Sequence, residues 1–165
     1  MPVLYNQAKG VDGIKQTLYA MQQLTNQAIT NELIRAQAAH AVASCSPGDT
    51  ICQQASLMIW VQRKMQFVKD PLGVEALHDP KAIALAIHHG KQPWGDCDDF
   101  SMYLAALMKS IGIPASFRAV GFNGGPLSHV YVVGRKGAKL DPTRNMWNPG
   151  VGELLPETSY LEVKV

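Results

Sequence analysis

The stretch Trp-Gly-Asp-Cys-Asp-Asp-Phe-Ser, residues 94–101, decides the fold that this sequence predicts. It places Cys97 where a loop containing Gly95 gives way to a helix that ends at Gly112. Unpaired backbone N–H groups and the helix dipole at such a position favour a thiolate, so Cys97 is a candidate nucleophile. The helix has one broad apolar face, made of Phe100, Tyr103, Leu104, Leu107, Met108 and Ile111.

Helical patterns precede this segment. Residues 14–44 contain no proline and repeat apolar residues at helical spacing, which predicts one long helix or two with a break near Thr30-Asn31. A further helix is expected from the 46–50 turn to about Val68, before Asp70-Pro71. Residues 1–12 are predicted to be irregular, and residues 74–78 to form a linker.

A short helix and then strands complete the pattern. Asp79-Pro80 is typical of an N-cap followed by proline at the first helical position, and Gly90 fits a C-terminal cap. The segments 114–122, 128–133 and 138–141 are β-branched or aromatic and bounded by glycine and proline, which predicts an antiparallel meander.

Helices followed by strands indicate an α+β fold with a central helix packed on a small antiparallel sheet. The 165 residues suit one compact domain. Within it we expect an N-terminal helical extension over residues 1–45 and a core over residues 46–165.

The bulk composition excludes some classes of partner. Apolar residues make up 47% of the chain and charged residues 17%, with a net charge of +2 and no long basic run. This favours a folded core and argues against binding to nucleic acid or to an anionic membrane. With no targeting pattern and no membrane-spanning run, the sequence predicts a cytoplasmic location at synthesis.

Two of the three cysteines flank a turn. Pro47-Gly48 between Cys45 and Cys52 could bring the two thiols together as a disulfide. A cytoplasmic chain is normally kept reduced, so two separate thiols are the favoured interpretation. In either case Cys97 is the unpaired cysteine.

Three acidic neighbours surround the candidate nucleophile. The carboxylates of Asp96, Asp98 and Asp99 raise the pKa of a nearby thiol, although at a helix start they also complement the dipole. We interpret Asp99 as an acid that complements the helix dipole. The thiol therefore needs a cationic partner, and His129 is the best placed of the five histidines, because it lies in an alternating strand.

The third member of a triad follows from strand parity. If residues 135–137 form a three-residue hairpin loop with glycine in the left-handed position, Asp141 lies opposite Tyr131 and His129 lies opposite Thr143. His129 and Asp141 then share a face as diagonal neighbours, roughly 7–8 Å apart at their Cα atoms. Asp141 could orient the imidazole. A two-residue loop would place the two side chains on opposite faces.

Four segments carry a family resemblance. Residues 94–101, Gly-Ile-Pro-Ala-Ser-Phe-Arg at 112–118, Ser-His-Val-Tyr-Val at 128–132 and Leu-Asp-Pro-Thr at 140–143 together resemble the core of the transglutaminase-like superfamily. They occur in the order of that family with short gaps. Tyr131 stands where many members have tryptophan, and the first 45 or so residues have no counterpart.

The resemblance implies a papain-like core and a site. Cys97 would be the nucleophile, His129 the base and acid, and Asp141 the orienting carboxylate, acting on a peptide or protein amide through a thioester. Family members include peptidases, amidases and cross-linking transglutaminases. The short chain favours hydrolysis here, because a transferase must exclude water. Stand-alone versions occur in phages and prophages, so a phage-encoded member is possible.

An oxyanion stabiliser is also required. The backbone N–H of Cys97 is the natural first donor. The second donor is left open between the side-chain amide of Gln92, the indole of Trp94 and the indole of Trp60.

Neither a metal nor a cofactor is predicted. Ligand type alone would allow a site from His88, His89, Asp96 and Cys97, but the spacing does not support it and zinc would consume the nucleophile. The alternative function is a structural or assembly protein, for example a virion component. It would bind a second copy or other virion proteins through its N-terminal helices.

Overall fold

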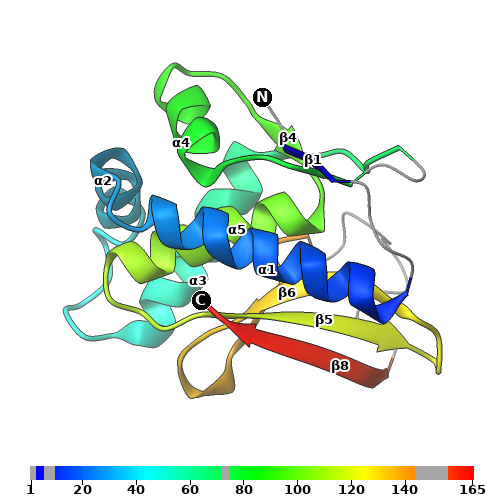
Figure 1. Cartoon of the computed structure of the whole chain (residues 1–165). Coiled ribbons are helices and arrows are strands. Elements are labelled where there is room, and N and C mark those ends of the chain that lie inside the picture. The colour runs from blue at the N-terminus through cyan, green and yellow to red at the C-terminus, as the bar shows by residue number, and fades with distance from the viewer. Residues whose placement is uncertain (1–2, 6–9, 72–74, 144–155) are drawn as a thin grey trace.

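The computed structural model describes residues 3–5, 10–71, 75–143 and 156–165. The chain is an α+β protein in which helices cover one face of an antiparallel sheet (Figure 1). The helices described are α1 (Val11–Ala28), α2 (Glu32–Ala41), α3 (Thr50–Lys64), α4 (Pro80–His88) and α5 (Cys97–Ser110). None of these described helices is both long and apolar enough to cross a bilayer.

Of the two alternatives for the N-terminal helical region, the break near Thr30-Asn31 is the one observed. Helix α1 ends at Ala28, and Asn31 is the N-cap of α2. The side-chain oxygen of Asn31 accepts hydrogen bonds from the backbone N–H groups of Leu33 and Ile34 at 3.0 and 3.1 Å. A short polar side chain that satisfies two N–H groups at once starts a new helix and turns the chain.

Helix α3 is shorter than predicted, because residues at its expected C-terminal end form a strand that pairs with a distant segment. It stops at Lys64 rather than near Val68, and Gln66–Phe67 forms strand β2. Strand β2 pairs in parallel with β4 (Trp94–Gly95). The N–H of Gln66 donates to the carbonyl of Pro93 at 2.9 Å. The partner is distant in sequence, so helical periodicity alone could not reveal this change.

A second small pairing was also missed. Strand β1 (Val3–Tyr5) runs antiparallel to β3 (Glu75–Leu77), although residues 1–12 were expected to be irregular and residues 74–78 to be a linker. Both strands have three residues, which is too short to show an alternating pattern in sequence. They are stable only as partners of each other.

The start of α4 is formed as predicted. The side chain of Asp79 accepts a hydrogen bond from the N–H of Lys81 at 2.8 Å, and Pro80 is the first helical residue. Gly90, just past the helix end, has a φ of 70°, which glycine adopts without strain.

The main sheet has the order β7-β6-β5-β8. The predicted meander corresponds to β5 (Ser116–Phe122), β6 (Leu127–Val133) and β7 (Lys139–Leu140), and all its pairings are antiparallel. The edge strand β8 (Glu157–Lys164) pairs with β5 and was not predicted. Figure 1 shows β8 in red along the outer edge of the sheet, beneath α1.

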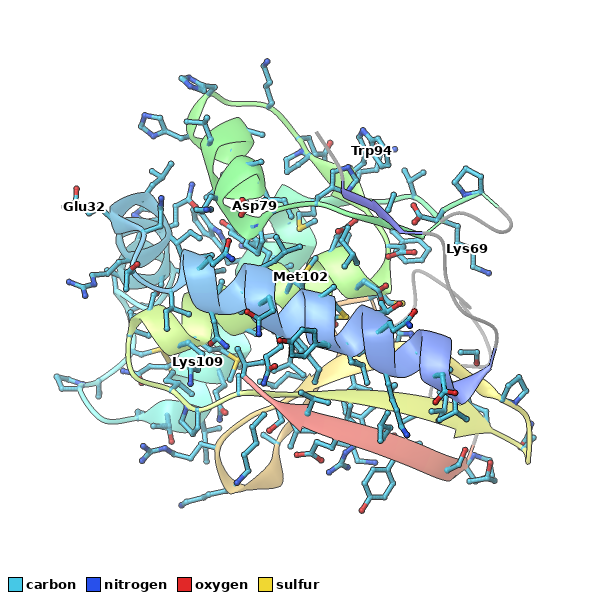
Figure 2. All side chains as sticks on the ribbon, in the orientation of Figure 1. Glu32, Lys69, Asp79, Trp94, Met102 and Lys109 are labelled. Atoms are coloured by element: carbon cyan, nitrogen blue, oxygen red, sulfur yellow. A yellow bond between two sulfur atoms is a disulfide. The ribbon has the colours of Figure 1, made fainter. Side chains whose placement is uncertain are left out.

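Helix α5 lies at the centre of the hydrophobic core. Residues 98–108 of this helix are all buried, including Met102, which is labelled in Figure 2. Leu18 and Met21 of α1 belong to the same core cluster as Phe117 and Val130 of the sheet. Residues on both sides of the predicted boundary at residue 45 therefore share one core, while the division itself remains a prediction.

Cys45 and Cys52 form a disulfide, with their Cα atoms 5.7 Å apart. The favoured expectation of two separate thiols was wrong in this structure, because it rested on compartment rather than geometry. The side chain of Asp49 accepts a hydrogen bond from the N–H of Cys52 at 3.0 Å and starts α3 directly after the turn. This geometry brings the two cysteines together.

We expect the disulfide to stabilise the fold. Closing so short a loop in the unfolded chain is worth about 2–3 kcal/mol in the chain-entropy treatment. Urea unfolding of the Cys45→Ser/Cys52→Ser variant should show a free energy of unfolding lower by about that amount. Reductant should lower the stability of the parent protein and leave the variant unchanged. An equal response of both proteins to reductant would contradict the assignment.

Candidate active site

Helix α5 begins at Cys97 and is held against the sheet at its start. Asp96 is the N-cap, and its side chain accepts a hydrogen bond from the N–H of Asp98 at 3.2 Å. One turn later, the hydroxyl of Ser101 donates to the backbone carbonyl of Val130 at 3.3 Å. These contacts place the start of the helix beside strand β6, the strand that carries His129.

The hairpin register is the one that the parity argument required. Residues 135–137 form a three-residue turn, and Val132 pairs with Leu140 across β6 and β7. Gly137 has a φ of 73°, the left-handed conformation expected at this position. The predicted three-residue loop is therefore confirmed.

This register brings His129 and Asp141 into contact. The Nε2 atom of His129 lies 2.7 Å from Oδ2 of Asp141. The side chain of His129 is only 4% exposed, and that of Asp141 is 19% exposed. A buried ring held this closely has a fixed orientation, which general acid–base chemistry needs.

The Asp141 carboxylate is held in its ionised form. Thr143 donates to its Oδ1 from both the backbone N–H, at 3.0 Å, and the hydroxyl, at 2.8 Å. Burial alone would raise the pKa of Asp141, but the interactions with His129 and Thr143 outweigh it and lower the pKa below its ordinary value. An ionised Asp141 favours the Nε2–H form of the imidazole, in which Nδ1 is the acceptor nitrogen.

Cys97 and His129 line the same cavity, which has a volume of about 400 Å³. Asp96 and Asp98 lie beside the thiol, and residues 126–130 form the wall around the imidazole. The other wall comes from α1, which passes in front of α5 in Figure 1. The cavity thus joins the start of α5, the β5–β6 turn and the first helix.

The thiol of Cys97 is protonated and turned toward an acid. Its Sγ donates to Oδ1 of Asp98 at 3.6 Å. Burial raises the pKa of Cys97 well above its ordinary value, and the charges of Asp98 and Asp96 raise it further. Across the part of the chain that the structure describes, Sγ makes no hydrogen bond to the His129 ring. His129 and Asp141 are thus paired, whereas Cys97 and His129 share only the cavity.

A second histidine–aspartate pair lies outside this cavity and was missed from sequence. Asp99 is fully buried and accepts two hydrogen bonds from His78, one from the backbone N–H at 2.7 Å and one involving Nδ1 at 2.8 Å. The interpretation of Asp99 as a residue that only complements the dipole was therefore wrong. The two residues are 21 positions apart, and no local motif marks the pairing.

The same pair explains the glycine before the nucleophile. A Cβ atom at Gly95 would collide with the side chain of Asp99. Glycine at position 95 therefore makes room for this carboxylate. The ring of Trp94 packs edge-on against His78, with ring centroids 4.8 Å apart, and closes the pair on its outer side.

The three side chains proposed as oxyanion donors lie elsewhere. The indole N–H of Trp60 donates to the hydroxyl of Tyr103 at 3.3 Å, and Trp60 lines a separate cavity. Trp94 is 48% exposed and is the first residue of β4, at the periphery of the molecule (Figure 2). Gln92 is exposed in the preceding loop. None of the three is among the described residues that line the Cys97 cavity, so the structure does not bring them to the thiol.

The backbone N–H of Cys97 remains the predicted oxyanion donor. The neighbouring N–H of Asp98 is taken by the Asp96 side chain. Cys97 is the first residue of α5, and the first N–H groups of a helix have no intrahelical acceptor.

A possible metal-ligand set lies at the same point. The ligand atoms of Asp96, Cys97 and Asp98 lie within 4.8 Å of one another. Asp96 already caps α5 and Asp98 already accepts from the thiol, so structural interactions account for the group. His88 and His89 contact each other at the end of α4 and are not part of it.

Comparison of the chain with protein-family models, with curated proteins and with solved structures gives no match. The chemistry of the site is therefore argued from its geometry.

The His78–Asp99 pair gives the fold a dependence on pH. The hydrogen bond to Asp99 raises the pKa of His78 above 6.5. A raised histidine pKa contributes stability that is complete below the unfolded-state pKa and is lost as the pH rises through the folded-state pKa. Urea unfolding should show that the stability advantage of the parent over His78→Gln decreases from about pH 6 upward. A constant difference between pH 5.5 and 8.5 would contradict this.

Asp98 is expected to restrain the thiol. Asp98→Asn keeps the size of the side chain and removes the charge that raises the pKa of Cys97, so the thiolate fraction should rise about tenfold for each unit by which that pKa falls. Alkylation by iodoacetamide at pH 7.5, followed by mass spectrometry, should be faster in this variant. Asp79→Asn is the matched control, because asparagine also caps helices. A rate equal to that of the parent would show that Asp98 exerts no such restraint.

Proposed function

We propose that this protein is a cysteine-dependent hydrolase or acyltransferase that cleaves a peptide- or isopeptide-type amide through a thioester, on a papain-like core of the transglutaminase-like kind. The observation that carries the proposal is the 2.7 Å contact between Asp141 and His129, which lines the same cavity as Cys97. Nucleophile, base and orienting acid on a helix start and two adjacent strands form the arrangement that thiol acyl transfer needs.

Each residue has one role in the reaction. Asp141 holds Nε2 of His129, so Nδ1 takes the proton of the Cys97 thiol. The sulfur attacks the carbonyl carbon, and the negative charge that forms on the carbonyl oxygen is stabilised by the Cys97 N–H. The C–N bond breaks as His129 gives its proton to the leaving amine. Water, deprotonated by His129, then attacks the thioester, and the thiol is restored.

The reaction requires the sulfur to change partner. In the observed state Sγ donates to Asp98, and burial and acidic neighbours keep it protonated. A rotation of the Cys97 side chain is the smallest motion that removes Sγ from Asp98. Catalysis then proceeds from the minor population in which the thiol faces Nδ1, so the resting enzyme is only weakly reactive toward small alkylating reagents.

Hydrolysis is favoured over transamidation. The cavity beside Cys97 has a volume of about 400 Å³, which leaves room for water next to a thioester on its sulfur. A transferase must exclude water to let an amine compete. Incubation with a glutamine peptide and a labelled amine distinguishes the two, since incorporation of amine faster than release of free acid would reverse this preference.

An assembly role is the second candidate. Val11 and Tyr19 on α1 are 55% and 62% exposed, and they lie eight residues apart on one side of the helix. Exposed apolar side chains on one helix face suit contact with a second copy or another protein, such as a virion component. Sedimentation of the parent and of Tyr19→Ala tests this role, which requires an oligomer that the substitution weakens.

Variants of the three residues test the enzymatic proposal. With a mixture of fluorogenic peptides, Cys97→Ala should abolish hydrolysis, and Asp141→Asn should lower kcat by about 10²–10⁴-fold with little change in KM. His129→Ala should be similarly impaired, whereas the exposed His40→Ala should match the parent. The thiol of the parent should also react with a peptide chloromethyl ketone faster than that of His129→Ala. The proposal would be wrong if the parent and His129→Ala turned over no peptide and reacted with the chloromethyl ketone at equal rates from pH 6 to 9.

A further inference from the structure

The N-terminal helix supplies one wall of the active-site cavity. Gly10 precedes α1, and Ile14, Thr17, Leu18 and Met21 lie on one face of this helix at helical spacing. All five line the cavity that holds Cys97 and His129. A segment predicted to be an extension for assembly is thus part of the site itself.

Among the described α1 residues that line the cavity, Thr17 is polar, and the larger side chains of Ile14, Leu18 and Met21 are apolar. Leu18 and Met21 are 2% and 0% exposed and form its floor, while Ile14 is half-buried and exposes the rest of its side chain. Leu127 is also half-buried and lines the cavity from the β5–β6 side. These side chains pack in the same cluster as Cys97. Water in contact with such a wall is readily displaced by an apolar group.

The chemistry of the site determines which part of a substrate reaches this wall. His129 must give a proton to the leaving amine, so the amine lies on the side of residues 126–130. The acyl group stays bonded to Cys97 as the thioester and takes the remaining space, beside α1. The volume of about 400 Å³ is within the usual range for small-ligand pockets and admits a large side chain there.

We propose that α1 forms the acyl-side specificity pocket and that the substrate is an amide whose acyl residue carries a bulky apolar side chain such as leucine. This inference rests on the proposed function. A glutamine acyl side chain would place its amide against Ile14 and Leu18, where a polar group loses its water. The pocket therefore also separates this site from a glutamine-directed transglutaminase.

Peptides that differ only in the acyl residue test the pocket. For the parent we expect kcat/KM to be about tenfold or more higher with leucine than with alanine or glutamine, the discrimination that apolar pockets achieve. Ile14→Ala should lower kcat/KM for the leucine peptide about tenfold and change that for the alanine peptide less than about threefold. Ile14→Phe should fill the space and also reduce the leucine preference.

Val11→Ala is the matched control, because Val11 is a β-branched apolar residue on the same helix and is 55% exposed. It should keep the leucine preference of the parent. Circular dichroism confirms that each variant is folded, and Ile14→Phe remains informative if Ile14→Ala unfolds. An unchanged leucine-to-alanine ratio in a folded Ile14 variant would overturn the inference.

Binding to Cys97→Ala separates this inference from the proposed function. NMR titration of that variant with leucine amide and alanine amide peptides measures the pocket without chemistry. Hydrolysis that depends on His129 but ignores the acyl residue would overturn the pocket and keep the function. Stronger binding of the leucine peptide that Ile14→Ala weakens, without turnover by the parent, would support the pocket and overturn the function.

Discussion

The burial of helix α5 is the constraint on which the rest of the structure depends. Its residues 98–108 are inaccessible to solvent, so helices and sheet must surround it on all sides. The bond from Ser101 to the carbonyl of Val130 then fixes the helix start against β6. That bond restrains the position of α5 along its axis and its rotation about that axis. It therefore also helps to determine where Cys97 lies relative to His129.

Two histidine–aspartate pairs flank this helix start, and their surroundings give them different roles. His129, held by Asp141, lines a cavity with Cys97, where we propose that a proton is passed to a bound molecule. His78 and Asp99 are packed behind Gly95 and covered by Trp94, and they tie the chain before α4 to α5. A histidine–aspartate pair that borders a cavity can take part in chemistry. A pair that is enclosed by packed side chains contributes to stability instead.

The electrostatics of Cys97 represent a balance between two environments. Burial and the carboxylates of Asp96 and Asp98 favour the neutral thiol, whereas a helix start and a nearby imidazole favour the thiolate. In the observed state, burial and the two carboxylates prevail, and the neutral thiol donates a hydrogen bond to Asp98.

The sequence by itself determined the central helix and the start of α4. It also named, among alternatives that it left open, the break before α2 and the hairpin register that joins His129 to Asp141. These features depend on local periodicity, capping and turn length, which a chain carries within a few residues. Tertiary structure alone decided the end of α3, strands β1 and β8, the His78–Asp99 pair and the α1 wall of the cavity. Each of these depends on partners distant in sequence, and the free energy of such contacts is realised only when the core assembles.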